Sequence, residues 1–275
     1  MQANKKIIDV EKVIEGKSPH LLKALPRFII RYLKRIIHQD EINEVLSQHE
    51  KMQGAELIDA VLRVMDVTYQ VEGIENISPD GHYLFASNHP LGGLDGMILI
   101  HMLGQKYPDV KFPVNDLLMH LTQLHSVFIP INKHGAQSSQ NARLLDQAYS
   151  LNTTQILYFP AGLCSRKQKG KIEDLEWKKS FITKAVKHQR DIVPVYFSGR
   201  NSNFFYNLAK LRAFLGIKAN IEMLYLVDEM FKQKGKSITV KIGKPYSYKI
   251  FDNSRTSKAW ADWVKKLVYD MAPKS

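Results

Sequence analysis

Residues 83–96 carry an apolar run, a glycine-rich loop and the start of an apolar helix: Tyr83-Leu84-Phe85-Ala86-Ser87-Asn88-His89-Pro90-Leu91-Gly92-Gly93-Leu94-Asp95-Gly96. The first four residues have the length and character of a buried strand, and the apolar residues that continue to Leu103 predict a helix. A strand that leads through a loop into a helix is the building unit of α/β proteins, because each helix then covers the sheet beside its own strand.

Short apolar runs and helical stretches alternate along most of the remaining chain. Besides Tyr83–Ala86, strands are expected at Val110–Val114, Val127–Ile131, Gln155–Phe159, Ile192–Phe197 and Ile238–Ile242. Helices are expected at Leu94–Leu103, Ser138–Leu151, Glu176–His188, Phe204–Leu215 and Ser257–Met271. The alternation predicts an α/β fold, with a mixed, mostly parallel sheet covered by helices.

Residues 1–70 show helical periodicity instead, in stretches at Ser18–His38, Asp40–Glu50 and Ala55–Tyr69. The first of these has an apolar face and a basic face, the latter made of Lys23, Arg27, Arg31, Lys34 and Arg35. Such a helix is typical of proteins that lie on lipid headgroups, although a helix packed on its own domain with a solvated basic face fits the same pattern. We expect an N-terminal helical, membrane-associating extension at 1–70 and the α/β domain at 71–275, with its motifs within about 83–198.

Composition narrows the class of protein. The 275 residues, 44% of them hydrophobic, suffice for a folded core, and the single cysteine, Cys164, excludes an internal disulfide and a cysteine-rich zinc site. No apolar run reaches the roughly 18 residues of a spanning helix, and Met1–Glu15 lack a secretory signal, so we expect a protein that is not exported. The net charge of +12 favours an anionic partner such as nucleic acid, a lipid surface or an acidic carrier protein.

The quoted loop holds two side chains suited to acid–base chemistry. His89 can take a proton from a hydroxyl near neutral pH, and Asp95 can orient the imidazole and stabilise the imidazolium that forms. Gly92 and Gly93 permit turns that are closed to other residues, so the loop can bring the two side chains together. The alternative is that His89 is an ordinary loop residue and Asp95 caps the following helix.

Three further segments support the pairing: Phe128-Ile129-Pro130-Ile131-Asn132-Lys133, Tyr158-Phe159-Pro160-Ala161-Gly162-Leu163-Cys164-Ser165-Arg166 and Ile192-Val193-Pro194-Val195. With the His89–Asp95 loop, they resemble in order and spacing the four sequence blocks of the glycerolipid acyltransferase family, typified by lysophosphatidate acyltransferases. The resemblance covers roughly residues 83–198.

The resemblance implies roles for individual residues. His89 would be the general base and Asp95 its orienting partner, and the acceptor hydroxyl would attack the thioester directly, without an acyl-enzyme. Lys133 would take the place of the arginine that grips acceptor phosphate. Substrate contacts would come from Asn88, Gly92, Gly93, Phe159, Pro160, Ala161, Gly162 and Arg166.

The chain departs from the family pattern at several positions. Five residues separate His89 from Asp95 where four are usual, Ala161 replaces a glutamate, and Leu163 and Cys164 replace a threonine and an arginine. These changes resemble a bacterial, hemolysin-like branch that includes enzymes O-acylating the lyso forms of amino-acid lipids such as ornithine or glycine lipids. An acceptor without phosphate would explain the weaker phosphate grip.

We therefore expect an O-acyltransferase of membrane lipid biosynthesis. It would move a fatty acyl group from acyl carrier protein or coenzyme A to the hydroxyl of lysophosphatidate or a lyso-amino-acid lipid, with no metal or organic cofactor. We expect it to be peripheral on the cytoplasmic face of the inner membrane, without a transmembrane helix. The alternative is a catalytically inactive family member that binds the membrane surface.

Other classes lack their sequence features. No nucleic-acid-binding motif and no set of basic residues interleaved with stacking aromatics accompanies the charge, so no nucleic-acid partner is expected. The chain has no nucleophile elbow, P-loop, dinucleotide fingerprint or zinc-protease helix.

Two segments allow two interpretations each. Asp174–Phe181 predicts a helix start with dipole-complementing acids, or alternatively a lip of the acyl-carrier site, and Asn201–Tyr206 predicts packing aromatics, or alternatively an acyl channel.

Overall fold

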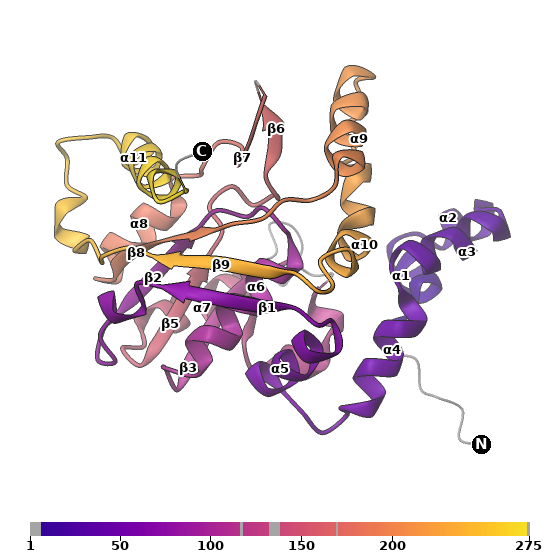
Figure 1. The fold of residues 1–275 in the computed structure, drawn as a ribbon, viewed down its shortest axis with the longest axis horizontal. Coiled ribbons are helices and arrows are strands. Elements are labelled where there is room, and N and C mark those ends of the chain that lie inside the picture. Colours follow the sequence, from indigo (N-terminus) through magenta and orange to yellow (C-terminus); the bar gives the residue numbers. More distant parts are fainter. Residues whose placement is uncertain (1–6, 116–117, 132–137, 169, 274–275) are drawn as a thin grey trace.

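The sheet has seven strands in the order β1-β9-β8-β2-β5-β3-β4 (Figure 1). The computed structural model describes residues 7–115, 118–131, 138–168 and 170–273. The strands are β1 (Thr68–Glu72), β2 (Tyr83–Ser87), β3 (Asp109–Val114), β4 (Phe128–Pro130), β5 (Thr154–Tyr158), β8 (Asp191–Phe197) and β9 (Ser237–Ile242). Every neighbouring pair is parallel except β8 and β9, which confirms the mixed, mostly parallel sheet.

Helices cover both faces because the residues of β2 point alternately to each side. Tyr83 and Phe85 pack into one core with α5 (Gly54–Val64) and α6 (Gly93–Gly104). Leu84 and Ala86 pack into a second core on the opposite face, built with side chains of α7, α8 and α11. These helices are α7 (Ser138–Ser150), α8 (Ser180–Lys187) and α11 (Ser257–Asp270).

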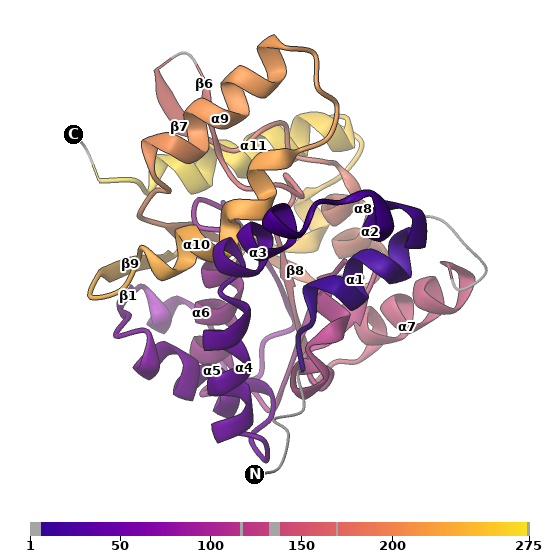
Figure 2. The same ribbon diagram turned by 90° about the vertical axis from the view of Figure 1, so that its right-hand side faces the viewer.

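The N-terminal quarter is helical, as expected, and its first four helices lie to one side of the sheet (Figures 1 and 2). Pro26 divides the helix expected at 18–38 in two, since its ring locks φ and removes a backbone donor. The helices are α1 (Val10–Lys17), α2 (Pro19–Ala24), α3 (Arg27–Ile36) and α4 (Gln39–Gln48). Within the described ranges, no helix combines the length and apolar character needed to cross a membrane.

A helical excursion and a small hairpin complete the fold. Between β8 and β9 the chain forms α9 (Asn203–Phe214), the 3-10 helix η4 (Ile221–Tyr225) and α10 (Leu226–Phe231). After β5 it forms the antiparallel pair β6 (Arg166–Gln168) and β7 (Lys171–Glu173).

Two expected boundaries are wrong. The helix predicted to reach Tyr69 ends at Val64, because residues 68–72 pair with β9 as the strand β1. The helix predicted to begin at Glu176 begins at Ser180 instead. Tertiary partners displace local helical propensity at both places.

Candidate active site

The loops after β2, β5 and β8 meet at one edge of the sheet because β2 is parallel to both neighbours. Asn88 fastens the loop after β2 to the end of β8. Its side-chain oxygen accepts from the N–H of Phe197 at 2.7 Å, and its amide donates to the carbonyl of Phe197 at 2.9 Å. Asn88 thus has a bracing role, and its predicted substrate contact stays a prediction.

His89 and Asp95 form the expected pair. The Nδ1 atom of His89 lies 3.0 Å from Oδ2 of Asp95, and the same oxygen accepts from the N–H groups of Leu91 at 2.8 Å and Gly92 at 3.1 Å. Asp95 stands in the first turn of α6 and is fully buried. The loop folds back around this carboxylate, which is how five intervening residues still bring the two side chains into contact.

Gly92 makes that turn possible. Its φ of 79° is a conformation that side-chain-bearing residues rarely adopt. A Cβ atom there would also lie 3.1 Å from the Leu226 side chain and 3.2 Å from the sulfur of Cys164. Gly93 follows as the first residue of α6. The turn therefore requires glycine at Gly92, as the sequence predicts, whereas Gly93 has no positive φ and has room for a Cβ atom.

Aromatic contacts fix the plane of the imidazole. The ring of Phe159, just after β5, stacks on His89 with centroids 4.1 Å apart and an angle of 23° between the planes. Phe112 meets Phe159 edge-on at 5.4 Å. The His89 side chain is 16% exposed. With Nδ1 donating to Asp95, the Nε2 atom is left to accept a proton.

Opposing effects act on the pKa of His89. Burial alone would lower it, whereas the sulfur of Cys164 and the carboxylate of Asp95 favour the charged ring and raise it. Together, these effects raise the pKa of His89 above its usual value of 6.5. Burial raises the pKa of Asp95, while the hydrogen bond from His89 acts the other way. His89 is therefore a stronger base than a histidine in water.

Asp174 is the residue of this site that sequence reasoning missed. Its side chain is fully buried, and Oδ1 accepts from the N–H of His89 at 3.1 Å and from the hydroxyl of Ser165 at 2.6 Å. Oδ2 accepts from the indole of Trp177 at 2.9 Å. One carboxylate thus joins the loop after β2 to the loop after β5.

The interpretation of Asp174 as a dipole-complementing acid at a helix start is wrong. α8 begins only at Ser180, and α11 holds the backbone of Asp174 in place. The N–H of Asp174 donates to the hydroxyl of Tyr269 at 2.6 Å, and the ammonium of Lys265 donates to its carbonyl at 2.7 Å. Asp174 and Trp177 are three residues apart, a spacing that allows the hydrogen bond between their side chains. The same spacing also occurs on one face of a helix, so it did not distinguish the two structures.

The loop after β5 lies against His89 through Phe159 and Ser165. The N–H of Ser165 donates to the carbonyl of His89 at 2.8 Å. Within the loop, the N–H of Gly162 donates to the carbonyl of Phe159 at 3.0 Å, and Gly162 has a φ of 68°. Ala161 is buried and brings no carboxylate to this place. Contacts of the loop with substrate stay a prediction.

Arg166 is occupied by partners within the protein. Its guanidinium donates to the carbonyl of Cys164 at 2.7 Å and to the buried carboxylate of Glu222 at 2.8 Å, and it lies 5.0 Å from the ring centre of Phe205. A buried guanidinium that is already paired offers little to a second anion. Its role in substrate binding stays a prediction, and Lys133 lies outside the described residues.

The geometry suits removal of a proton from a hydroxyl at the edge of the sheet. It supplies an oriented base, a buried carboxylate and a closely packed loop. Across the residues that the structure describes, no group of three or more His, Cys, Asp or Glu side chains is placed to hold a metal ion.

Comparison with known proteins gives matches over nearly the whole chain. The profile of the family described as Acyltransferase matches residues 12–273. A lyso-glycine lipid O-acyltransferase of Bacteroides thetaiotaomicron is 48% identical over 266 residues, which are 96% of this chain and 97% of that protein. Its counterpart in Phocaeicola vulgatus is 46% identical over 96% of this chain and 95% of its own.

Among solved structures, the 1-acyl-sn-glycerophosphate acyltransferase PlsC of Thermotoga maritima is similar to this chain. It is 19% identical in sequence, covers 90% of this chain and 94% of its own, and superposes with a TM-score of 0.45.

The raised pKa of His89 predicts a dependence of acyl transfer on pH. His89 must be neutral to accept a proton, so kcat/KM falls as pH drops through this pKa, with a midpoint above 6.5. Asp95→Asn removes a carboxylate that raises the pKa, so the midpoint moves to lower pH and the rate at high pH falls about 10²- to 10⁴-fold. Profiles of kcat/KM against pH for both proteins test this, and an unchanged midpoint would contradict it.

Asp174 is expected to act by positioning His89. Asp174→Ala removes the acceptor of the His89 N–H, and the resulting shift of the loop lowers kcat about 100-fold with little change in KM. Steady-state kinetics beside thermal unfolding measure the effect.

Asp174→Asn is the matched control, because it keeps an oxygen that can accept from His89 and Ser165. It should recover most of the lost kcat. If both variants lose kcat equally, or if both lose stability without a change in kcat, Asp174 does not position the base.

Proposed function

Because this chain belongs to the acyltransferase family, we propose that it is an O-acyltransferase that moves a fatty acyl group from a thioester to the hydroxyl of a lysolipid. The observation that carries the proposal is the hydrogen bond of 3.0 Å between His89 and Asp95 at the end of β2. The pair is oriented, largely buried and placed where two neighbouring loops can receive substrates.

The reaction needs one base and no covalent enzyme intermediate. The Nε2 atom of His89 takes the proton of the acceptor hydroxyl as its oxygen attacks the thioester carbonyl. The carbon–sulfur bond then breaks, and the thiolate of the carrier leaves with the proton returned by His89. Asp95 keeps the ring in the reactive tautomer and stabilises the imidazolium between these steps.

A lyso-amino-acid lipid, and lyso-glycine lipid in particular, is the acceptor that the observations favour. Both curated relatives are named lyso-glycine lipid O-acyltransferases. Arg166 is engaged by Glu222, and Ala161 brings no charge to the loop beside His89. An acceptor that lacks phosphate does not need an unpaired arginine at this position to bind it.

The donor is acyl carrier protein or acyl coenzyme A, and the basic surface favours the acidic carrier protein. The protein works at the cytoplasmic face of the inner membrane, where the exposed bases Lys23, Arg27 and Arg31 of α2 and α3 attract anionic headgroups.

A panel of acceptors tests the proposed function. The intact protein is given acyl carrier protein or coenzyme A thioesters together with lyso-glycine lipid, lyso-ornithine lipid or lysophosphatidate in detergent micelles. Mass spectrometry of the products should show that kcat/KM for lyso-glycine lipid exceeds that for lysophosphatidate at least about tenfold.

Heat-inactivated protein controls for spontaneous acyl transfer. If only lysophosphatidate reacts, the acceptor is wrong although the reaction class stands. If none of the acceptors gives product with either donor, the proposed function itself is contradicted.

A further inference from the structure

Exposed apolar side chains gather on two segments that are far apart in the sequence. α2 and α3 expose Leu21, Phe28 and Tyr32, and the segment 204–224 exposes Phe204, Leu211, Phe214, Leu215, Ile217 and Leu224. Phe214, the last residue of α9, is 86% exposed. Single exposed apolar residues are ordinary, but a cluster of this kind marks an interaction surface.

α9 is apolar on opposite sides. Phe205 and Ala209 point into the protein and are buried, whereas Phe204, Leu211 and Leu215 follow at helical spacing on the outward side. Apolar side chains on a helix face normally pack against another element. Figure 1 shows α9 projecting beyond the sheet, and Leu211, Phe214 and Leu215 stay exposed on it.

Both segments are basic. Neither residues 16–39 nor residues 199–221 contain an Asp or Glu, and Glu222, which follows, is buried and paired with Arg166 and Arg212. Their exposed bases include Lys23, Arg27, Arg31, Lys210 and Lys218, and none of these forms an ion pair with another described residue. Apolar side chains among unpaired cations match an anionic bilayer, where headgroups attract the cations and acyl chains accept the aromatic and aliphatic groups.

Aromatic contacts join the two segments into one surface. The hydroxyls of Tyr32 in α3 and Tyr225 in η4 are 2.8 Å apart, and the rings of Tyr225 and Phe204 meet edge-on at 5.0 Å. Beside them is a hollow of about 470 Å³, which is also lined by Arg35 and by Asp228, whose carboxylate is paired with Lys232. The hollow gives room for a lipid headgroup next to an exposed guanidinium.

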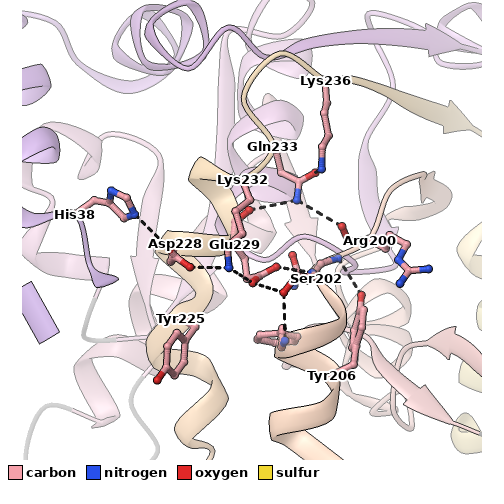
Figure 3. A network of polar contacts seen from close by, with 12 residues as sticks. His38, Arg200, Ser202, Tyr206, Tyr225, Asp228, Glu229, Lys232, Gln233 and Lys236 are labelled. Carbon is pink, nitrogen blue, oxygen red and sulfur yellow. Dashed lines mark hydrogen bonds and ion pairs between the residues drawn. The ribbon is translucent and has the colours of Figure 1, made fainter. Parts of the chain in front are cut away.

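A polar network connects the elements of this surface (Figure 3). Ser202, the N-cap of α9, donates through its hydroxyl to the buried carboxylate of Glu229 in α10 at 2.6 Å. Lys232 pairs with Glu229 at 2.8 Å and with Asp228 at 2.7 Å. Asp228 lies 3.2 Å from Nε2 of His38, at the junction of α3 and α4. The base of α9 is thereby tied to the N-terminal helices.

The same excursion of the chain contacts the glycine turn of the candidate active site. Leu226, at the start of α10, packs so closely on Gly92 that a Cβ atom there would lie 3.1 Å from it. Met230 lies beside Gly93, 4.0 Å from the place of a Cβ atom. The excursion that carries α9 therefore also contacts the loop that carries His89.

We propose that α2, α3, η4 and α9 form one docking face for an anionic bilayer, with Phe214 and Leu215 inserted among the acyl chains. Docking places the His89 loop beside the interface, at the depth where the hydroxyl of a lysolipid lies. The inference rests on the proposed function only in that its acceptor is a membrane lipid. It assigns α9 as a second anchor, which orients the enzyme together with the N-terminal helices.

The test is co-sedimentation of the full chain with vesicles of phosphatidylglycerol and phosphatidylethanolamine, beside vesicles of phosphatidylcholine. The double variant Phe214→Ser, Leu215→Ser should bind the anionic vesicles at least about tenfold more weakly than the intact protein, since two inserted side chains are lost. The matched control, Leu151→Ser with Val186→Ser, also removes two exposed apolar side chains, but away from the docking face, and should bind as the intact protein does.

Activity separates this inference from the proposed function. The α9 variant should lose activity toward an acceptor presented in anionic vesicles and keep it in detergent micelles. Phe214→Trp should gain fluorescence that lipids with brominated acyl chains quench. Equal vesicle binding by the α9 variant and the control, or vesicle binding by neither these nor the intact protein, would overturn the proposal. The proposal would also be overturned if the α9 variant bound vesicles as the intact protein does but bound acyl carrier protein more weakly.

Discussion

The carboxylate of Asp95 is the group on which the rest of the site depends. One of its oxygens accepts hydrogen bonds from the Nδ1 atom of His89 and from the backbone N–H groups of Leu91 and Gly92. Two of these donors belong to the backbone, so the carboxylate determines the path of the loop as well as the orientation of the ring. Its burial keeps water from competing for the three bonds and makes each of them stronger than at the surface.

The parts of the site that the sequence predicted are local in the chain. His89, Gly92 and Asp95 lie within one loop, and the apolar runs on either side locate the strand and helix that hold it. Asp174 could not be found in this way, because it reaches His89 from 85 positions along the chain and leaves no periodic pattern. The pairing of Arg166 with Glu222 was hidden for the same reason. Local pattern predicts elements, whereas contacts between distant segments need the fold.

The chain between β8 and β9 contacts the loop of His89 and also carries the proposed membrane anchor. α10 packs on the glycine turn beside His89, and α9 carries apolar side chains outward from the same excursion. Glu229 connects the two helices through Ser202 and is itself buried, so its charge is compensated within the network. A reaction whose acceptor is embedded in a bilayer benefits when the base and the anchor belong to one rigid unit.

The role of His89 as the base is tested most directly by transfer to a micellar acceptor with His89→Ala, beside His120→Ala as a surface histidine control. The account predicts a fall in kcat of about 10²- to 10⁴-fold for His89→Ala alone, with thermal unfolding close to that of the intact protein. A rate for His89→Ala near that of the control would contradict the assignment of the base and, with it, the mechanism.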